Sequence, residues 1–232
     1  MSRPARIGVI SFPGTCDDRD ALRAVELSGG EAVALWHADD DLGGCSGVIV
    51  PGGFSYGDYL RAGAIARFAP MMDQVARFAA EGGPVLGICN GFQVLCEAGL
   101  LPGALLPNTS LRFVCRQVDV VIEHSDSVFT RECEPGQTLS LPVKHGFGRW
   151  YAPDHELDAL ERDGQLVLRY AAGHNPNGSV RDVAGVTNEQ GNVLGLMPHP
   201  EHAVDELNGS ADAAHLFGSL AATLQALSPA AA

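Results

Sequence analysis

A chain of 232 residues with 46% apolar side chains can bury the core of one α/β domain, and we expect a single domain over residues 1–232. Its 28 acidic residues outnumber the 15 basic ones and leave a net charge of -13, which disfavours nucleic acid and anionic membranes as partners. No apolar run reaches the roughly 20 residues of a membrane span, and no signal peptide pattern precedes the first strand, so we expect a cytoplasmic protein.

Strand and helix signals alternate over the first half of the chain. Short apolar runs predict strands at residues 7–11, 32–36, 47–50 and 84–88. Helices are expected from the N-cap Asp17 to Leu27, over residues 60–80, and from the fourth strand to Ala98. This alternation predicts a parallel sheet with helices on both faces.

Strand signals predominate after about residue 111. They predict strands at 113–122, 139–143, 166–170, 181–187 and 193–197, followed by a helix at 211–227. Residues 189–192 look like a hairpin turn between the last two strands. The expected fold is therefore α/β: an open, mostly parallel twisted sheet with helices on both faces, plus antiparallel strands in the C-terminal half.

Cys89 is the candidate nucleophile. It stands where an apolar strand runs into a helix, with Gly87 and Gly91 two residues to either side. Such glycines leave room for a sharp turn that exposes a nucleophile, and the positive end of a helix dipole favours a thiolate. The alternative is a small buried core cysteine, which is the interpretation we give to Cys96 and Cys115.

The other cysteines are expected to be free thiols. The chain contains six cysteines and no C-x-x-C pair, so the sequence predicts neither a disulfide framework nor a metal site.

His199 is the candidate base. It follows the strand at 193–197 and lies between Pro198 and Pro200, which hold the backbone extended. Residues two apart in extended backbone face the same way, so Glu201 can orient the imidazole and complete a triad. The rival base is His145, whose glycine-rich surroundings favour a flexible loop at the substrate entrance or a partner contact. The alternative for His199 is an ordinary loop histidine.

Gly52 and Gly53 end the third strand in a glycine-rich loop. They can bring backbone N–H groups close to a ligand. A phosphate cradle is the competing interpretation, but the loop lacks the Lys-Ser/Thr ending of a P-loop. Loops at the ends of strands share one crevice in an open α/β sheet, so the loops at Gly52, Cys89 and His199 are expected to converge.

These three motifs in this order resemble the class I glutamine amidotransferases. They are Pro51-Gly52-Gly53, Gly87-Ile88-Cys89-Asn90-Gly91-Phe92-Gln93 and His199-Pro200-Glu201. The resemblance implies Cys89 as nucleophile, His199 as base and Glu201 as its orienter. It also implies that Asn90 and Gly53 supply oxyanion N–H groups and that glutamine is bound by Gly52, Gly53, Asn90, Gln93 and Ser110.

A closer likeness is to the glutaminase subunits of phosphoribosylformylglycinamidine synthase. It is carried by residues 12–17, 53–58, 108–113, 175–179 and 203–205. It implies a role in de novo purine synthesis, a large ATP-dependent synthetase subunit as partner, and room for a small accessory subunit. The chain has no Walker-type loop, so no cofactor is expected in it, and ATP and Mg²⁺ would be used by the partner.

The chain departs from that family at two positions. Phe147 stands where the family has glutamate, which removes any carboxylate-dependent role of residues 145–148. His202 stands where arginine is usual after Glu201, which weakens an ion pair near the triad. His202 is otherwise expected to be a surface or helix residue, like His37, His124, His155, His174 and His215.

Three other functions remain open at this point. A subunit serving another synthetase, such as that for GMP, anthranilate or carbamoyl phosphate, would share the site and differ in the acceptor of ammonia. A stand-alone cysteine hydrolase would accept γ-glutamyl substrates without a partner. A binding module that has lost catalysis conflicts with the presence of Cys89, His199 and Glu201 together.

Overall fold

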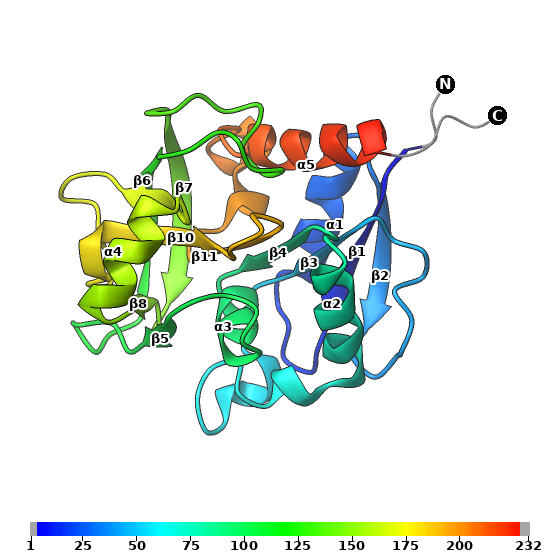
Figure 1. Cartoon of the computed structure of the whole chain (residues 1–232), viewed down its shortest axis with the longest axis horizontal. Coiled ribbons are helices and arrows are strands. Elements are labelled where there is room, and N and C mark those ends of the chain that lie inside the picture. Colours follow the sequence, from blue (N-terminus) through cyan, green and yellow to red (C-terminus); the bar gives the residue numbers. More distant parts are fainter. Residues whose placement is uncertain (1–3, 228–232) are drawn as a thin grey trace.

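A nine-stranded sheet runs through the part of the chain that the computed structural model describes, residues 4–227. Figure 1 shows its strands crossing the middle of the molecule, in the order β2-β1-β3-β4-β11-β10-β9-β6-β7. The strands are β1 (Arg6–Ser11), β2 (Glu31–Trp36), β3 (Gly47–Val50), β4 (Val85–Ile88), β6 (Val114–Ile122), β7 (Thr138–His145), β9 (Leu166–Tyr170), β10 (Val183–Thr187) and β11 (Val193–Leu196). Strands β5 (Ala104–Leu106) and β8 (Arg149–Tyr151) form a separate two-stranded antiparallel sheet.

The sheet changes direction at β11. Strands β2, β1, β3, β4 and β11 pair in parallel, whereas β10, β9, β6 and β7 continue the sheet in antiparallel fashion. Every residue of β3, β4 and β11 is buried, as expected for strands covered on both faces. The predicted fold class, with its antiparallel C-terminal strands and the turn before β11, is confirmed.

The register of β11 places the two central loops together. Leu196 at the end of β11 pairs with Ile88 at the end of β4, and the Cys89 N–H donates to the Leu196 carbonyl at 2.8 Å. Because both strands end at the same edge of the sheet, the loops that follow them lie side by side.

Helices cover both faces of the parallel strands. The α-helices of the described chain are α1 (Asp18–Leu27), α2 (Pro70–Ala80), α3 (Asn90–Glu97), α4 (Asp154–Arg162) and α5 (Ala214–Leu227). In Figure 1, α1 and α5 lie above these strands and α2 and α3 below them, whereas α4 packs beside the antiparallel strands.

Several sequence predictions of local structure were wrong. The helix expected over 60–80 begins only at Pro70, because Ala69 before the proline is extended (φ -67°, ψ 141°) and Leu60 has a positive φ of 70°. Helix α4 and strands β5 and β8 were not predicted. Cys115 is exposed near the free start of β6 and is not a core residue.

Candidate active site

Cys89 occupies a strained turn between β4 and α3. Its φ of 49° and ψ of -102° are costly for a residue with a side chain, and such strain is typical of functional positions. The flanking glycines make the turn sterically possible. A Cβ atom on Gly91 would lie 1.8 Å from the Val50 carbonyl oxygen, and one on Gly87 would lie 2.4 Å from the Leu95 side chain. The structure therefore confirms why glycine is needed on both sides of this cysteine.

His199 and Glu201 form a buried pair after β11. The imidazole Nδ1 lies 2.6 Å from Glu201 Oε1, and both side chains are almost fully buried. The His199 backbone N–H donates to the Pro142 carbonyl at 2.8 Å, which fixes the loop against β7. Burial alone disfavours the imidazolium, but the Glu201 carboxylate and the Cys89 sulfur raise the pKa of His199 to about 10.

Cys89 and His199 meet at one small cavity of about 60 Å³. Since Nδ1 faces Glu201, the ring nitrogen left for the thiol is Nε2, which is buried and has no hydrogen-bond acceptor or donor among the described residues within bonding distance. The Cys89 sulfur itself is 3.8 Å from the Lys144 carbonyl oxygen. The side chains predicted as nucleophile, base and orienter are thus brought together.

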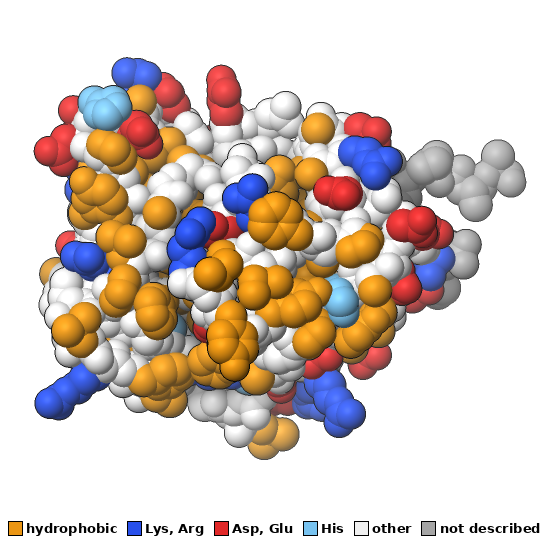
Figure 2. Space-filling model, turned by 90° about the horizontal axis from the view of Figure 1, so that it is seen from below, with side chains coloured by type: hydrophobic (Ala, Val, Ile, Leu, Met, Phe, Trp, Pro, Cys, Tyr) orange, Lys and Arg blue, Asp and Glu red, His pale blue; other side chains and the backbone are white. Residues whose placement is uncertain are grey.

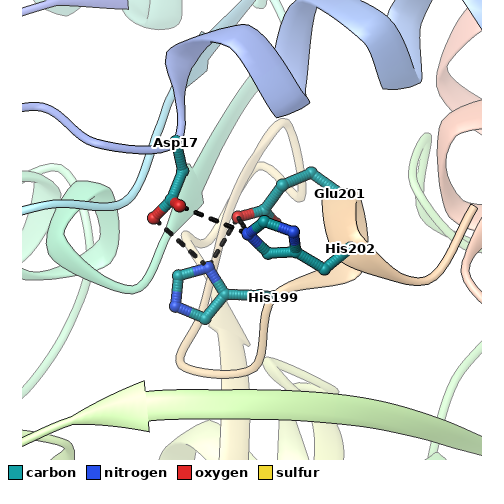
Figure 3. A group of neighbouring side chains, drawn as sticks. All are labelled: Asp17, His199, Glu201 and His202. Atoms are coloured by element: carbon teal, nitrogen blue, oxygen red, sulfur yellow. Dashed lines mark hydrogen bonds and ion pairs between the residues drawn. The ribbon is translucent and has the colours of Figure 1, made fainter. Parts of the chain in front are cut away.

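Asp17 places a second carboxylate beside the imidazole (Figure 3). Its Oδ2 lies 3.7 Å from His199 Nδ1. Asp17 occupies the N-cap position of α1, yet its side chain makes no capping hydrogen bond and turns into the site instead. Gly52 makes this approach possible, because a Cβ atom there would lie 2.4 Å from Asp17 Oδ2 and 2.7 Å from the His199 ring.

Lys144 and His202 hold the other oxygen of Asp17. The Lys144 ammonium forms an ion pair with Asp17 Oδ1, and His202 Nε2 lies 3.2 Å from the same oxygen. His202 Nε2 is also 2.9 Å from Lys144 Nζ. Although burial opposes it, the His202 hydrogen bond and the charges of His199 and Lys144 lower the pKa of Asp17 well below its usual range. His202 is therefore part of the site, which its interpretation as an ordinary surface or helix residue did not anticipate.

The same cluster has the residue types of a metal site. The ligand atoms of Asp17, His199, Glu201 and His202 lie within 4.8 Å of one another. The Lys144 ammonium already contacts two of these four side chains and supplies the positive charge that the carboxylates require. A metal at His199 Nδ1 would also displace the Glu201 hydrogen bond, so the arrangement fits an orienting network better than a metal centre.

A larger pocket of about 210 Å³ opens on the other side of Cys89. Gln93 donates from Nε2 to the Phe147 carbonyl at 2.6 Å, which ties α3 to the loop after β7. Three phenylalanines line the pocket and remain partly exposed at its rim: Phe54, Phe113 and Phe147. The pocket therefore combines a polar floor near the thiol with an apolar mouth.

Two backbone donors, one lining this pocket and one on the residue after Cys89, have no acceptor among the described residues. The N–H groups of Gly53 and Asn90 make no hydrogen bond within residues 4–227, and Gly53 lines the pocket and the smaller cavity with Cys89. Gly53 has a φ of 148°, and a Cβ there would lie 2.7 Å from the Gly14 carbonyl oxygen. Free N–H groups beside a nucleophile are what a developing oxyanion requires.

His145 belongs to a second buried polar cluster on the far wall of the pocket. Its Nδ1 lies 3.2 Å from Asn108 Oδ1, and its Nε2 lies 3.4 Å from Asn177 Nδ2. A neutral imidazole that donates from Nδ1 and accepts at Nε2 satisfies both amides. Burial, and secondarily the charge of His199, lower the pKa of His145 to about 4. The predicted flexible loop was wrong, because His145 is the buried last residue of β7.

Ser110 is the predicted substrate contact that lies apart from the others. It is exposed, does not line the pocket, and its hydroxyl accepts from the Arg112 N–H at 3.3 Å. In the same segment Asn108 is fully buried and donates to the His145 carbonyl.

Comparisons with known proteins agree with this geometry. Residues 4–219 match the model of the CobB/CobQ-like glutamine amidotransferase domain. The chain is 60% identical over 221 residues to phosphoribosylformylglycinamidine synthase subunit PurQ of Nocardia farcinica, covering 95% of this chain and 98% of the relative. It is 59% identical over 217 residues to the PurQ subunit of Rubrobacter xylanophilus, covering 94% and 98%.

A solved structure extends the agreement to three dimensions. A chain in the structure of PurLQS from Thermotoga maritima matches with a TM-score of 0.88 and 44% sequence identity, covering 96% of this chain and all of the other. The chain therefore belongs to the CobB/CobQ-like glutamine amidotransferases and, among them, to the PurQ family of phosphoribosylformylglycinamidine synthase subunits.

Proposed function

We propose that this protein is the glutaminase subunit of phosphoribosylformylglycinamidine synthase. It hydrolyses glutamine to glutamate and ammonia and delivers the ammonia to an ATP-dependent synthetase subunit in purine biosynthesis. The observation that carries the proposal is the meeting of Cys89, in its strained turn, with the buried His199–Glu201 pair at one cavity. The high identity to PurQ subunits supports the choice of pathway.

The proposed chemistry has two stages. The Cys89 thiolate adds to the carbonyl carbon of the glutamine side-chain amide, and the N–H groups of Gly53 and Asn90 stabilise the oxyanion. His199, held as an imidazolium by Glu201, gives its proton to the departing nitrogen, so ammonia leaves and a γ-glutamyl thioester remains. His199 then takes a proton from water, which attacks the thioester, releases glutamate and restores the Cys89 thiolate beside the His199 imidazolium.

The pocket beside Cys89 is the proposed glutamine site. Gly53 and Gln93 line it together with Cys89. Gly52 contributes by its lack of a side chain, which lets Asp17 and His199 approach each other. Asn90, the first residue of α3, donates from its side-chain amide to Asp58 and Gln93 and so holds both residues in the pocket. Any role of the exposed Ser110 requires a contact that forms when substrate or a partner binds.

The proposed partner is a large ATP-dependent synthetase, which would bind ATP and Mg²⁺, while this chain needs no cofactor of its own. Figure 2, which views the molecule from below, shows apolar side chains gathered near the centre of that face. Large exposed apolar residues of the described chain include the pocket rim and its sequence neighbours: Phe54, Tyr59, Leu60, Leu111, Phe113 and Phe147. An apolar rim around a pocket is suited to a protein contact that keeps ammonia from water.

The proposed location is the cytoplasm, which is consistent with the relationship to subunits of a purine-biosynthesis enzyme. None of the helices within residues 4–227 has the length and apolarity needed to cross a membrane.

The decisive experiment replaces the nucleophile. Cys89→Ala in the complex with the synthetase should abolish glutamate release, because no thioester can form. Cys45→Ala is the matched control, since that thiol precedes β3 and lines neither cavity of the site, and should keep wild-type turnover. Glutamate release by Cys89→Ala at the wild-type rate would overturn the proposed function.

A second measurement addresses the partner. Glutamate and ammonia are assayed with and without the ATP-dependent synthetase from the same cell, and stimulation by the synthetase is expected. Equal turnover in both cases would favour a stand-alone hydrolase.

A further inference from the structure

The pocket beside Cys89 has a single acidic side chain in its lining, Asp58. Phe54, Phe113 and Phe147 also line the pocket, and their side chains offer no charge to a ligand. The other charged lining residue is Lys144, whose ammonium is engaged by Asp17. The electrostatics of the pocket therefore depend on one carboxylate.

Asp58 is only half satisfied. Its Oδ1 accepts from Asn90 Nδ2 at 3.1 Å, whereas its Oδ2 makes no hydrogen bond within residues 4–227. No Lys, Arg or His of the described chain lies within ion-pair distance of it, and burial raises the pKa of Asp58 to about 6. A partly buried carboxylate without a cation is costly unless a ligand brings the positive charge.

The backbone holds Asp58 in place at a conformational cost. Its φ is 53°, and Tyr56 and Leu60 in the same loop also have positive φ values of 52° and 70°. The Ser55 N–H donates to Asn90 Oδ1 at 3.0 Å, which fastens the loop to the start of α3. Strain of this kind persists where surrounding contacts over-determine a functional geometry.

Asp58 lies within reach of an amino acid bound at Cys89. Its hydrogen-bond partner Asn90 directly follows the nucleophile, and the same amide nitrogen donates to Gln93 Oε1 at 2.8 Å. Only a short methylene chain separates the scissile amide of glutamine from its α-ammonium group. A carboxylate in this part of the pocket thus faces the cationic end of the substrate.

We propose that Asp58 binds the α-ammonium group of glutamine and makes the site selective for free amino acids over amides that lack this group. The inference rests on the proposed glutaminase activity and adds a specificity residue to it. The resulting charge-assisted hydrogen bond supplies the missing cation for Asp58.

The test combines a change in the protein with a change in the ligand. Binding of L-glutamine and of glutaramate, which is glutamine without its amino group, is measured by calorimetry in a Cys89→Ala background where no turnover occurs. Asp58→Asn in that background removes the charge but retains an oxygen that can accept from Asn90, and asparagine tolerates the positive φ. Asp73→Asn on the exposed side of α2 is the matched control.

Without the Asp58 change, glutamine should bind about 10- to 100-fold more tightly than glutaramate, as expected for a hydrogen bond between charged groups. Asp58→Asn should weaken glutamine binding by a similar factor and leave glutaramate unaffected, so that the preference disappears. Asp73→Asn should keep the preference. Circular dichroism checks that each variant is folded.

Two outcomes would overturn the inference. Equal weakening of both ligands would mean that Asp58 acts only by holding Asn90. Equal binding of both ligands before Asp58 is changed would exclude ammonium recognition even if Asp58→Asn does not fold. Failure of the protein to bind glutamine at all would instead count against the proposed function, so the two hypotheses fail in different ways.

Discussion

Two buried histidines near Cys89 have opposite electrostatic surroundings: His145 lines the larger pocket and His199 the smaller cavity. His199 faces the carboxylates of Glu201 and Asp17, and against the effect of burial the Glu201 carboxylate and the Cys89 sulfur raise its pKa. His145 is bonded by the neutral amides of Asn108 and Asn177, and burial keeps it uncharged. Burial alone acts in the same direction on both rings. The charge of the neighbours therefore decides which histidine can carry a proton in catalysis and which one only shapes the wall.

The strongest test of this contrast exchanges each imidazole for an amide. His199→Gln should lower glutamate formation by about 10³–10⁴-fold, because the thiol loses its proton acceptor and the leaving nitrogen its donor. His145→Gln should lower it by about tenfold or less, since a neutral amide can replace a neutral ring. Steady-state turnover in the synthetase complex measures both. A larger loss in His145→Gln would reverse the assignment of the two histidines.

The contrast is sharpened within the His199 cluster by comparing its two carboxylates. Glu201→Gln should cost on the order of 10³-fold in turnover, because it loses the charge bonded to Nδ1 at 2.6 Å. Asp17→Asn should lower turnover by about tenfold. Its carboxylate oxygen lies 3.7 Å from the same nitrogen, so it stabilises the imidazolium by charge and without a hydrogen bond. Asp18→Asn, whose carboxylate bonds Ser11 outside the site, is the control. Equal losses at residues 17 and 201 would show that the two carboxylates act as one unit.

The smallest effect is expected in the pH dependence of stability. The pKa of His145 is depressed to about 4 from an unfolded value near 6.5, so its neutral form stabilises the fold above pH 6.5. On the order of 3 kcal/mol should be lost as the pH falls from 6.5 to 4. His199 has the opposite sign: its raised pKa gives stability that is present below pH 6.5 and lost as pH rises toward 10.

Urea unfolding across pH 4–10 measures both linkages. Relative to wild type, His145→Gln should flatten the acid side of the stability curve, and His199→Gln should flatten the alkaline side. Parallel curves for the wild type and both variants would contradict the difference between the two clusters.

The candidate catalytic centre could be identified from the sequence because its signals are local. Cys89 lies between two glycines at the end of a strand, and the prolines around His199 mark a rigid loop, so residue type and position carry the information. The α/β alternation and the antiparallel C-terminal strands follow from runs of apolar residues in the same way. These features need no knowledge of which strands become neighbours.

The supporting residues were missed because their roles arise from tertiary contacts. The sequence indicates that Asp17 caps a helix. Its turn toward His199 depends on the space left by Gly52, which becomes visible only in the folded chain. The glycines near His145 indicate a loop, although Asn108 and Asn177 bury that ring from distant parts of the chain. Helix α4 is short and buries only Leu157 and Leu160, so its helical spacing was overlooked, and the effect of Pro70 on residues 60–69 was underestimated.

The position of β11 between β4 and β10 has a consequence for biosynthesis of the enzyme. The ribosome completes the thiol-bearing turn long before it releases the segment with the imidazole. Until that late strand inserts into the sheet, the nascent polypeptide cannot consume its substrate. Ammonia is thus not liberated by molecules whose synthesis is unfinished.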